Sequence, residues 1–174
     1  MSDTARPRGG FRPVLHFGSV LEIPPDLFAA RGVRAVALDV DNTITRWELE
    51  SVPGEILDWI AALKSRGLSL ALVSNGVARK LKSVEEQTGV ALVPGKKPFL
   101  STFVRCREFF GAPDSQIAIV GDQCVTDIWP ANRLGWLTVL VEPMSRRDFI
   151  GTHIYRAMER AFGMRRALEG GGSP

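Results

Sequence analysis

Four stretches of the chain carry side chains that can hold charge or transfer protons. These side chains are Asp39, Asp41 and Thr43 in LDVDNTIT, Ser74 and Asn75 in VSNG, Lys96 and Lys97 in GKKP, and Asp122 and Asp127 in GDQCVTD. Carboxylates that lie close together need a cation to stay ionised, because like charges raise one another's pKa. Carboxylate oxygens suit Mg²⁺, whose coordination shell a substrate phosphate can complete. The acidic residues therefore indicate a magnesium site.

The VSNG and GKKP segments add groups that bind anions. Ser74 is followed by Asn75 and Gly76 directly before a predicted helix, and backbone N–H groups at a helix start attract phosphate. A lysine of GKKP would offset remaining negative charge; Lys97, directly before Pro98, fits this role better than Lys96. Together with the carboxylates, these groups indicate phosphoryl transfer, in which catalysis depends mainly on positioning and charge stabilisation.

Apolar stretches alternate with helix-like stretches along the chain. Strands are predicted over residues 33–40, 68–74, 90–94, 116–122 and 137–143, and helices over residues 53–67, 77–89, 98–110 and 126–135. Most of these strands are apolar without alternation, which is typical of strands buried on both faces. The pattern predicts an α/β, Rossmann-like, three-layer domain with a mainly parallel five-stranded sheet. Ligands of such sheets bind outside the carboxyl ends of the strands, so the polar groups should meet at one edge.

Local features refine this outline. Strand alternation predicts that Asp39 and Asp41 share a face. Pro130 would break the last helix or mark its beginning. Cys106 falls on a helical pattern and is expected in the core, whereas Cys124 is expected in a loop where it could be exposed. Two cysteines form no disulfide framework and suit a reducing compartment.

Length and composition describe an ordinary globular protein. The chain has 174 residues, 45% hydrophobic and 24% charged, with a formal net charge of +3, which fits one domain. That charge tolerates anionic partners without requiring nucleic acid, and no nucleic acid partner is expected. The sequence contains neither a secretory signal nor an apolar run of the roughly 18 residues that span a bilayer. A cytoplasmic protein is predicted.

The chain is expected to divide into four segments. These are a disordered basic segment over residues 1–13, the α/β domain over 14–145, a basic amphipathic helix over 146–168 and a flexible tail over 169–174. The amphipathic helix would either pack on the domain or lie on a membrane surface, where it would make the protein peripheral at the inner face of a membrane.

The four motifs resemble those of the haloacid dehalogenase superfamily. LDVDNTIT is similar to its first motif, VSNG to the second, the lysine of KKP to the third and GDQCVTD to the fourth, in the right order. The tryptophan of ILDWI and the spacing of GDQCVTDIWPANRLG resemble subclass IIIA, the YqeG-like branch that includes phosphatidylglycerophosphate phosphatases. Gly76 departs from this branch, which often has a second asparagine there.

The resemblance implies a role for each residue. Asp39 would be the nucleophile that forms an aspartyl-phosphate, and Asp41 the general acid and base. The metal ligands would be Asp39, the backbone carbonyl of Asp41 and Asp122, with Asp127 supporting through water or lysine contact. Thr43, Ser74, Asn75 and Lys97 would steady the loop or bind phosphate. Asn132 and Arg133 would be further candidates for substrate contact.

The resemblance also predicts an open site. Superfamily members often carry a cap domain, but only residues 46–53 and 95–97 occupy the places where caps are inserted. An open edge admits a large substrate and, together with the basic amphipathic segment, favours a lipid phosphate such as phosphatidylglycerophosphate. A soluble sugar phosphate, a nucleotide or a phosphoprotein remain alternatives, as does a non-catalytic phosphate-binding scaffold.

Overall fold

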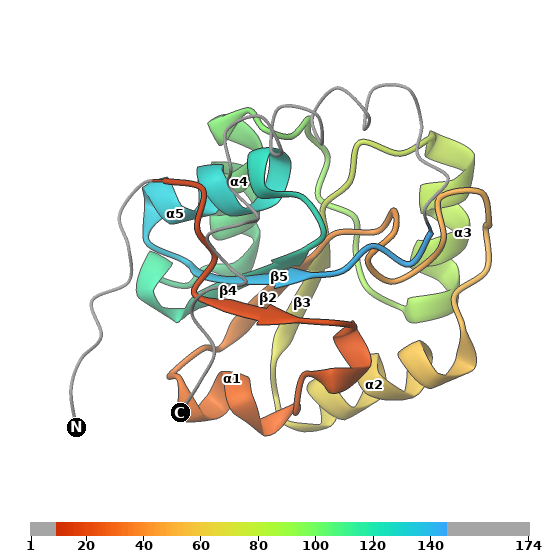
Figure 1. Cartoon of the computed structure of the whole chain (residues 1–174), viewed down its shortest axis with the longest axis horizontal. Helices are drawn as coiled ribbons and strands as arrows, with labels where there is room; N and C mark the ends of the chain where they lie inside the picture. The colour runs from red at the N-terminus through yellow and green to blue at the C-terminus, as the bar shows by residue number, and fades with distance from the viewer. Residues whose placement is uncertain (1–9, 146–174) are drawn as a thin grey trace.

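The apolar stretches form a parallel sheet at the centre of the molecule (Figure 1). The computed structural model describes residues 10–145. The strands are β1 (Leu15–Phe17), β2 (Ala35–Leu38), β3 (Ser69–Leu72), β4 (Ile117–Gly121) and β5 (Leu137–Val141). They lie in the order β1-β5-β4-β2-β3, and every neighbouring pair is parallel. This confirms the predicted α/β fold with a parallel five-stranded sheet, and residues 10–145 contain no cap domain.

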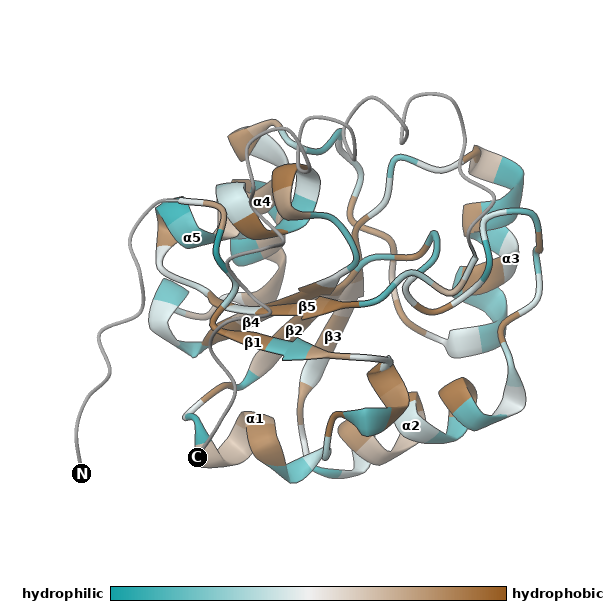
Figure 2. Cartoon of the chain, in the orientation of Figure 1, coloured by the Kyte–Doolittle hydropathy of each residue, from teal (hydrophilic) through white to brown (hydrophobic). Residues whose placement is uncertain are grey.

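Helices cover both faces of the sheet (Figure 1). They are α1 (Asp26–Ala30), α2 (Gly54–Ser65), α3 (Ala78–Thr88), α4 (Leu100–Phe110) and α5 (Trp129–Leu134). The pleat of β2 divides the core, because Val36 and Leu38 cluster with residues of α1, α2 and α3, whereas Ala35 and Ala37 cluster with residues of α4 and α5. In Figure 2 the central strands β2, β4 and β5 are mostly brown, as expected for strands buried on both faces, whereas the edge strand β1 is partly teal.

The fifth strand differs from the prediction. Residues 90–94 form no strand, and Leu92 makes only an isolated bridge to Leu72 of β3. The missing strand is β1, which pairs with β5 at the other edge of the sheet. β1 has only three residues, and none of them is fully buried. It therefore lacks the continuous apolar run by which the central strands were predicted.

The segment after β4 also differs in detail. A π-helix, η3 (Cys124–Ile128), precedes α5, so Pro130 falls in the first turn of α5, where its missing N–H group costs little. Cys124 is fully buried in η3 rather than exposed in a loop, because its side chain packs with Ile128 and Leu140. Cys106 is buried as predicted, and burial raises the pKa of its thiol to about 12.

Residues 10–13 were predicted to be disordered but pack against α5. The side-chain amide of Asn132 donates hydrogen bonds to the carbonyls of Gly10 and Arg12 at 3.0 and 2.8 Å. Phe11 stacks on Trp129 with a centroid distance of 5.9 Å. These contacts fix the residues that lead into β1. The sequence did not indicate them, because an Arg-, Gly- and Pro-rich composition is typical of disordered segments.

Part of the predicted domain plan lies outside the described residues. The basic amphipathic helix over 146–168, the tail over 169–174 and residues 1–9 of the basic segment belong to this part. Within residues 10–145, none of the helices combines the length and the apolar character that crossing a bilayer requires.

Candidate active site

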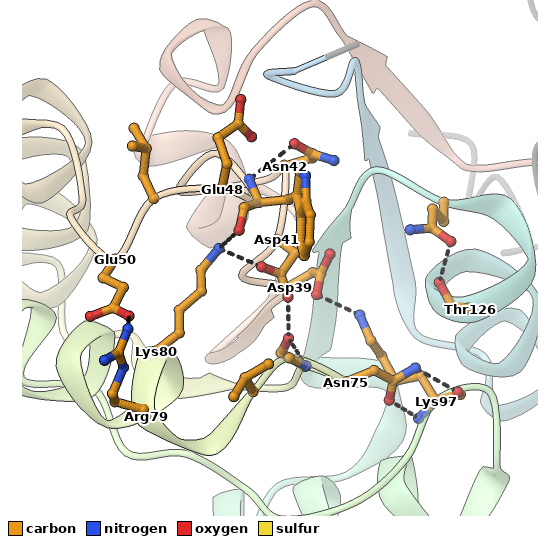
Figure 3. Close-up of a pocket in the computed structure, with 16 residues that line it drawn as sticks. Asp39, Asp41, Asn42, Glu48, Glu50, Asn75, Arg79, Lys80, Lys97 and Thr126 are labelled. Atoms are coloured by element: carbon orange, nitrogen blue, oxygen red, sulfur yellow. Dashed lines mark hydrogen bonds and ion pairs between the residues drawn. The ribbon is translucent and has the colours of Figure 1, made fainter. Parts of the chain in front are cut away.

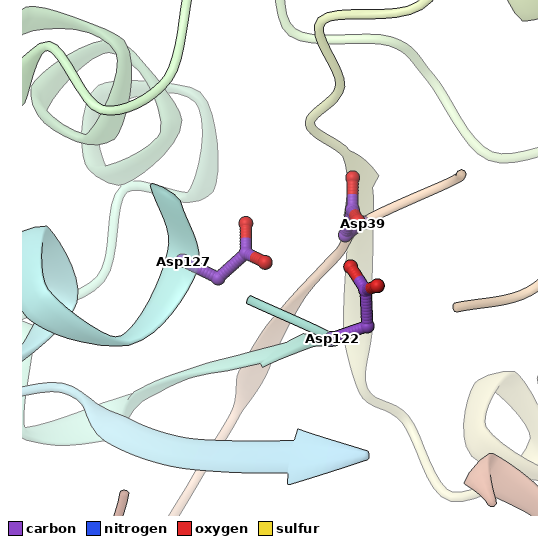
Figure 4. Close-up of side chains that lie close together, drawn as sticks. All are labelled: Asp39, Asp122 and Asp127. Carbon is purple, nitrogen blue, oxygen red and sulfur yellow. The ribbon is translucent and has the colours of Figure 1, made fainter. Parts of the chain in front are cut away.

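Three buried carboxylates converge beyond the carboxyl ends of the central strands (Figure 4). Asp39 directly follows β2, Asp122 directly follows β4, and Asp127 reaches back from η3. Oxygen atoms of the three side chains lie within 4.8 Å of one another. Gly121 makes this approach possible, since a Cβ atom there would lie 2.4 Å from a carboxylate oxygen of Asp127. The neighbouring parallel strands β2 and β4 therefore bring together residues 83 positions apart in the chain.

A single buried lysine joins two of these carboxylates. The Nζ atom of Lys97 donates to Asp39 Oδ1 at 2.6 Å and to Asp127 Oδ1 at 2.5 Å. Its neighbour Lys96 is exposed. Asn75 holds Lys97 in place, because its side chain accepts from the Lys97 backbone N–H at 2.7 Å and donates to the Lys97 carbonyl at 2.8 Å. The structure therefore brings Lys97, which the sequence favoured over Lys96, to the carboxylates.

The charges in this cluster do not balance. Burial raises the pKa of Asp39 to about 7, with the attraction of Lys97 opposing the rise and the negative charges of Asp127 and Asp41 adding to it. Burial alone would lower the pKa of Lys97, but attraction to Asp127 and Asp39 outweighs it and raises the pKa. One ammonium group balances only one of three ionised carboxylates. A further cation at this point would remove the remaining repulsion.

The donor set fits a hard divalent cation. The three carboxylates offer only oxygen ligands, as Mg²⁺ prefers, and include no thiolate or imidazole. The two oxygens of Asp127 already accept hydrogen bonds, from Lys97 at 2.5 Å and from the backbone N–H of Gln123 at 3.1 Å. The charge and hydrogen bonds of Asp127 therefore hold Lys97 beside Asp39.

Asp41 occupies a different part of the site from Asp39 (Figure 3). Its Oδ1 accepts from Lys80 Nζ at 2.5 Å and its Oδ2 from Ser74 Oγ at 3.1 Å. Because β2 ends at Leu38, strand alternation does not position Asp41 as the prediction assumed. Gly76 leaves room for this carboxylate, since a Cβ atom there would lie 2.7 Å from Asp41 Oδ2.

Sequence reasoning missed Lys80. This residue of α3 is only 7% exposed, and its ammonium donates to Asp41 and to the carbonyls of Arg46 and Trp47 at 2.9 and 2.8 Å. All three of its N–H groups thus have an acceptor. A signal was present, because Lys80, Val84 and Thr88 follow one another at intervals of four and form the buried stripe of α3.

The remaining predicted residues lie around the cluster. Thr43 is buried and donates its hydroxyl to Asp39 Oδ2 at 3.2 Å. The Ser74 hydroxyl, besides binding Asp41, accepts from the Gly76 backbone N–H at 3.0 Å. Asn132 and Arg133 do not line the pocket described below. Asn132 binds residues 10–13, and Arg133 lies over the Trp129 ring.

A pocket of about 530 Å³ connects the two parts of the site (Figure 3). Its lining comprises Asp39, Asp41, Asn42, Trp47, Glu48, Leu49, Glu50, Ser74, Asn75, Gly76, Val77, Arg79, Lys80, Lys97, Gln123 and Thr126. Asn42 adopts a φ of 62°, a left-handed conformation that asparagine tolerates. The chain turns there into residues 46–50, so this segment forms one side of the pocket.

Two named proteins resemble the chain in sequence. It is 28% identical over 151 residues to "Probable phosphatase YqeG" of Bacillus subtilis (strain 168), covering 86% of this chain and 88% of that protein. It is 31% identical over 134 residues to phosphatidylglycerophosphate phosphatase 1, chloroplastic/mitochondrial, of Arabidopsis thaliana. That match covers 71% of this chain but 38% of the Arabidopsis protein.

Solved structures share the fold. A cobalt-bound deoxy-D-mannose-octulosonate 8-phosphate phosphatase (YrbI) from Haemophilus influenzae superposes with a TM-score of 0.51 and 16% identity. The match covers 76% of this chain and 91% of that one. The sequence pattern of the family described as mitochondrial PGP phosphatase matches residues 5–145. The chain belongs to this family of the haloacid dehalogenase superfamily and is a phosphatase of the haloacid dehalogenase type.

Proposed function

We propose that the protein hydrolyses a phosphomonoester with the help of Mg²⁺ and through an aspartyl-phosphate on Asp39. The observation that carries the proposal is the convergence of Asp39, Asp122 and Asp127, two of which bind Lys97, beside a pocket that Asp39 and Lys97 line. Asp39 and Asp122, with the backbone carbonyl of Asp41, would hold the cation. When bound, Mg²⁺ supplies positive charge that offsets the negative charge of the phosphoryl group and of the carboxylates.

Two steps follow from these roles. In the first, a carboxylate oxygen of Asp39 attacks phosphorus, the bond from phosphorus to the ester oxygen breaks, and Asp41 gives its proton to the departing alkoxide. In the second, Asp41 takes a proton from water as the water oxygen attacks the aspartyl-phosphate, which releases phosphate and restores the Asp39 carboxylate. Lys97 orients Asp39 at 2.6 Å, and Thr43 holds its other oxygen at 3.2 Å.

The proposed substrate is a lipid phosphate such as phosphatidylglycerophosphate. The family description and the Arabidopsis relative's name support this class, and the lack of a cap domain within residues 10–145 leaves room for a large substrate. We also propose that the protein is cytoplasmic and acts as a peripheral protein at the membrane surface. The test is a screen of the full chain and its Asp39→Asn variant against lipid phosphates, sugar phosphates, nucleotides and phosphopeptides. Asp39-dependent turnover of phosphatidylglycerophosphate alone supports the proposal, and a preference for sugar phosphates contradicts it.

Removal of the metal should abolish activity. We expect a chelator such as EDTA to stop phosphate release and added Mg²⁺ to restore it. Mg²⁺ should also raise the melting temperature, because a ligand that binds only the folded state stabilises it.

Asp122→Asn should weaken the apparent Mg²⁺ affinity about 10-fold or more, measured as the concentration that half-restores activity. The exposed Asp26→Asn is the matched control. Unchanged rates after chelation would contradict the metal requirement.

Lys80→Met should impair turnover by releasing Asp41. Loss of the three hydrogen bonds from Lys80 frees both the Asp41 carboxylate and the backbone of residues 46–47. We expect kcat/KM for p-nitrophenyl phosphate to fall on the order of 10- to 100-fold and the free energy of unfolding to fall by about 2 kcal/mol. Lys82→Met is the control, because the Lys82 side chain is 78% exposed on the same helix. Wild-type kinetics in Lys80→Met would show that Asp41 needs no such support.

A further inference from the structure

Exposed apolar side chains gather at the pocket. Six large hydrophobic side chains are exposed within residues 10–145, and three of them line this pocket. They are Trp47 at 36%, Leu49 at 42% and Val77 at 70% exposure. We call these three residues the apolar wall. Apolar side chains scattered singly over a surface need no explanation, but a cluster beside a site marks a place for an apolar ligand.

The apolar wall adjoins Asp41. The same Lys80 ammonium binds the Asp41 carboxylate at 2.5 Å and the Trp47 carbonyl at 2.8 Å. Val77 directly follows Gly76, whose Cα must approach Asp41 without a side chain. In Figure 3, Glu48, Glu50 and Lys80 lie on one side of the central aspartates, and Lys97 and Thr126 lie on the other. The apolar wall and Lys97 therefore line one pocket, and the wall adjoins Asp41.

The segment that carries Trp47 and Leu49 is firmly attached to α3. The carbonyl of Glu50 accepts from the Ser83 hydroxyl at 3.3 Å and from the Gln87 amide at 2.7 Å. The side chain of Glu50 pairs with Arg79 at 2.5 Å. With the two Lys80 hydrogen bonds, these contacts hold residues 46–50 in place, so the apolar wall is a built surface of the folded protein.

We infer that the apolar wall binds the hydrocarbon part of the alcohol that leaves during the reaction. The inference rests on the proposed function, in which phosphate binds near Lys97 and Asp41 protonates the leaving oxygen. A substrate with its phosphate at Asp39 would extend its alcohol past Asp41 and onto the wall. Two of the wall's three side chains are aliphatic, and the third is the aromatic side chain of Trp47. The wall thus selects amphiphilic phosphomonoesters over sugar phosphates and nucleotides.

Soluble alkyl phosphates test this inference without a membrane. In a series from ethyl to octyl phosphate below micelle-forming concentrations, kcat/KM of the full chain should rise about twofold per added methylene group. Leu49→Ser and Val77→Ser should each lower the octyl-to-ethyl ratio about three- to tenfold. Leu21→Ser is the matched control, because Leu21 is 41% exposed but lies outside the pocket. It should leave the ratio unchanged.

A binding measurement separates this inference from the proposed function. Alkylphosphonates keep the phosphorus and the chain but have no ester bond to hydrolyse, so calorimetry with them reports the apolar wall whether or not turnover occurs. Affinity that rises with chain length in the wild type and less in Leu49→Ser supports the wall even if no ester is hydrolysed. The inference is overturned if the affinity does not depend on chain length. It is also overturned if the dependence is equal in the wild type, Leu49→Ser and Val77→Ser. Preferred binding of nucleoside monophosphates also overturns it.

Discussion

Asp39→Asn should abolish the turnover of p-nitrophenyl phosphate, with a loss on the order of 10⁴-fold or more in kcat. An amide has no negative oxygen to attack phosphorus, so the covalent step cannot occur. The asparagine side chain has nearly the same shape, and Lys97 retains its partner Asp127 at 2.5 Å. Folding should therefore survive, and the far-ultraviolet circular dichroism spectrum should match that of the wild type. Phosphate release under saturating substrate and Mg²⁺ is the measurement.

Two controls make the Asp39 result specific. Asp26→Asn removes an exposed carboxylate that pairs with Arg66 far from the pocket, and its activity should equal that of the wild type. Rapid acid quenching of the wild type during turnover, followed by mass spectrometry, should find the phosphoryl group on the peptide that contains Asp39. Full activity of Asp39→Asn, or phosphate on another residue, would remove Asp39 as the nucleophile.

Lys97→Met should cause the largest loss of stability of any variant considered. It leaves Asp39 and Asp127 buried without their shared ammonium, 3% and 0% exposed respectively, beside Asp122. Removing one partner of a buried ion pair costs about 3–5 kcal/mol, and we expect the free energy of unfolding in EDTA to fall by that amount. Turnover should also be lost, because Asp39 loses its orienting contact. Urea denaturation measures the first effect and phosphate release the second.

The neighbouring lysine supplies the matched control for Lys97. Lys96 is exposed, so Lys96→Met should change neither stability nor activity appreciably. The deficit of Lys97→Met should shrink at acid pH, because the Asp39 carboxylate, whose pKa burial raises, then takes up a proton and no longer repels its neighbours. Mg²⁺ should recover part of it. Equal stability of Lys97→Met and Lys96→Met would show that the buried charges do not need Lys97.

The order of the elements could be predicted from local patterns. A strand buried on both faces can be recognised from its own continuous apolar residues, without knowledge of its neighbours in space. Each of β2, β3, β4 and β5 lies within a predicted range. β1 could not be recognised in this way, since its three residues become a strand only by pairing with β5, more than 120 positions away in the chain. The burial of Cys124 likewise depends on contacts with Leu140, which no local pattern contains.

The sequence by itself was enough to identify the acidic and basic groups that follow the strands, because each motif directly adjoins the end of a predicted strand in the chain. Only the tertiary structure decided how these groups pair. Lys97 meets Asp39 across 58 positions and Lys80 meets Asp41 across 39, and such contacts arise from the packing of α3 and the loop before α4 against the sheet. The same packing leaves Trp47, Leu49 and Val77 exposed at the pocket. A sequence pattern marks residues as apolar, but whether they enter the core or line a site depends on what packs over them.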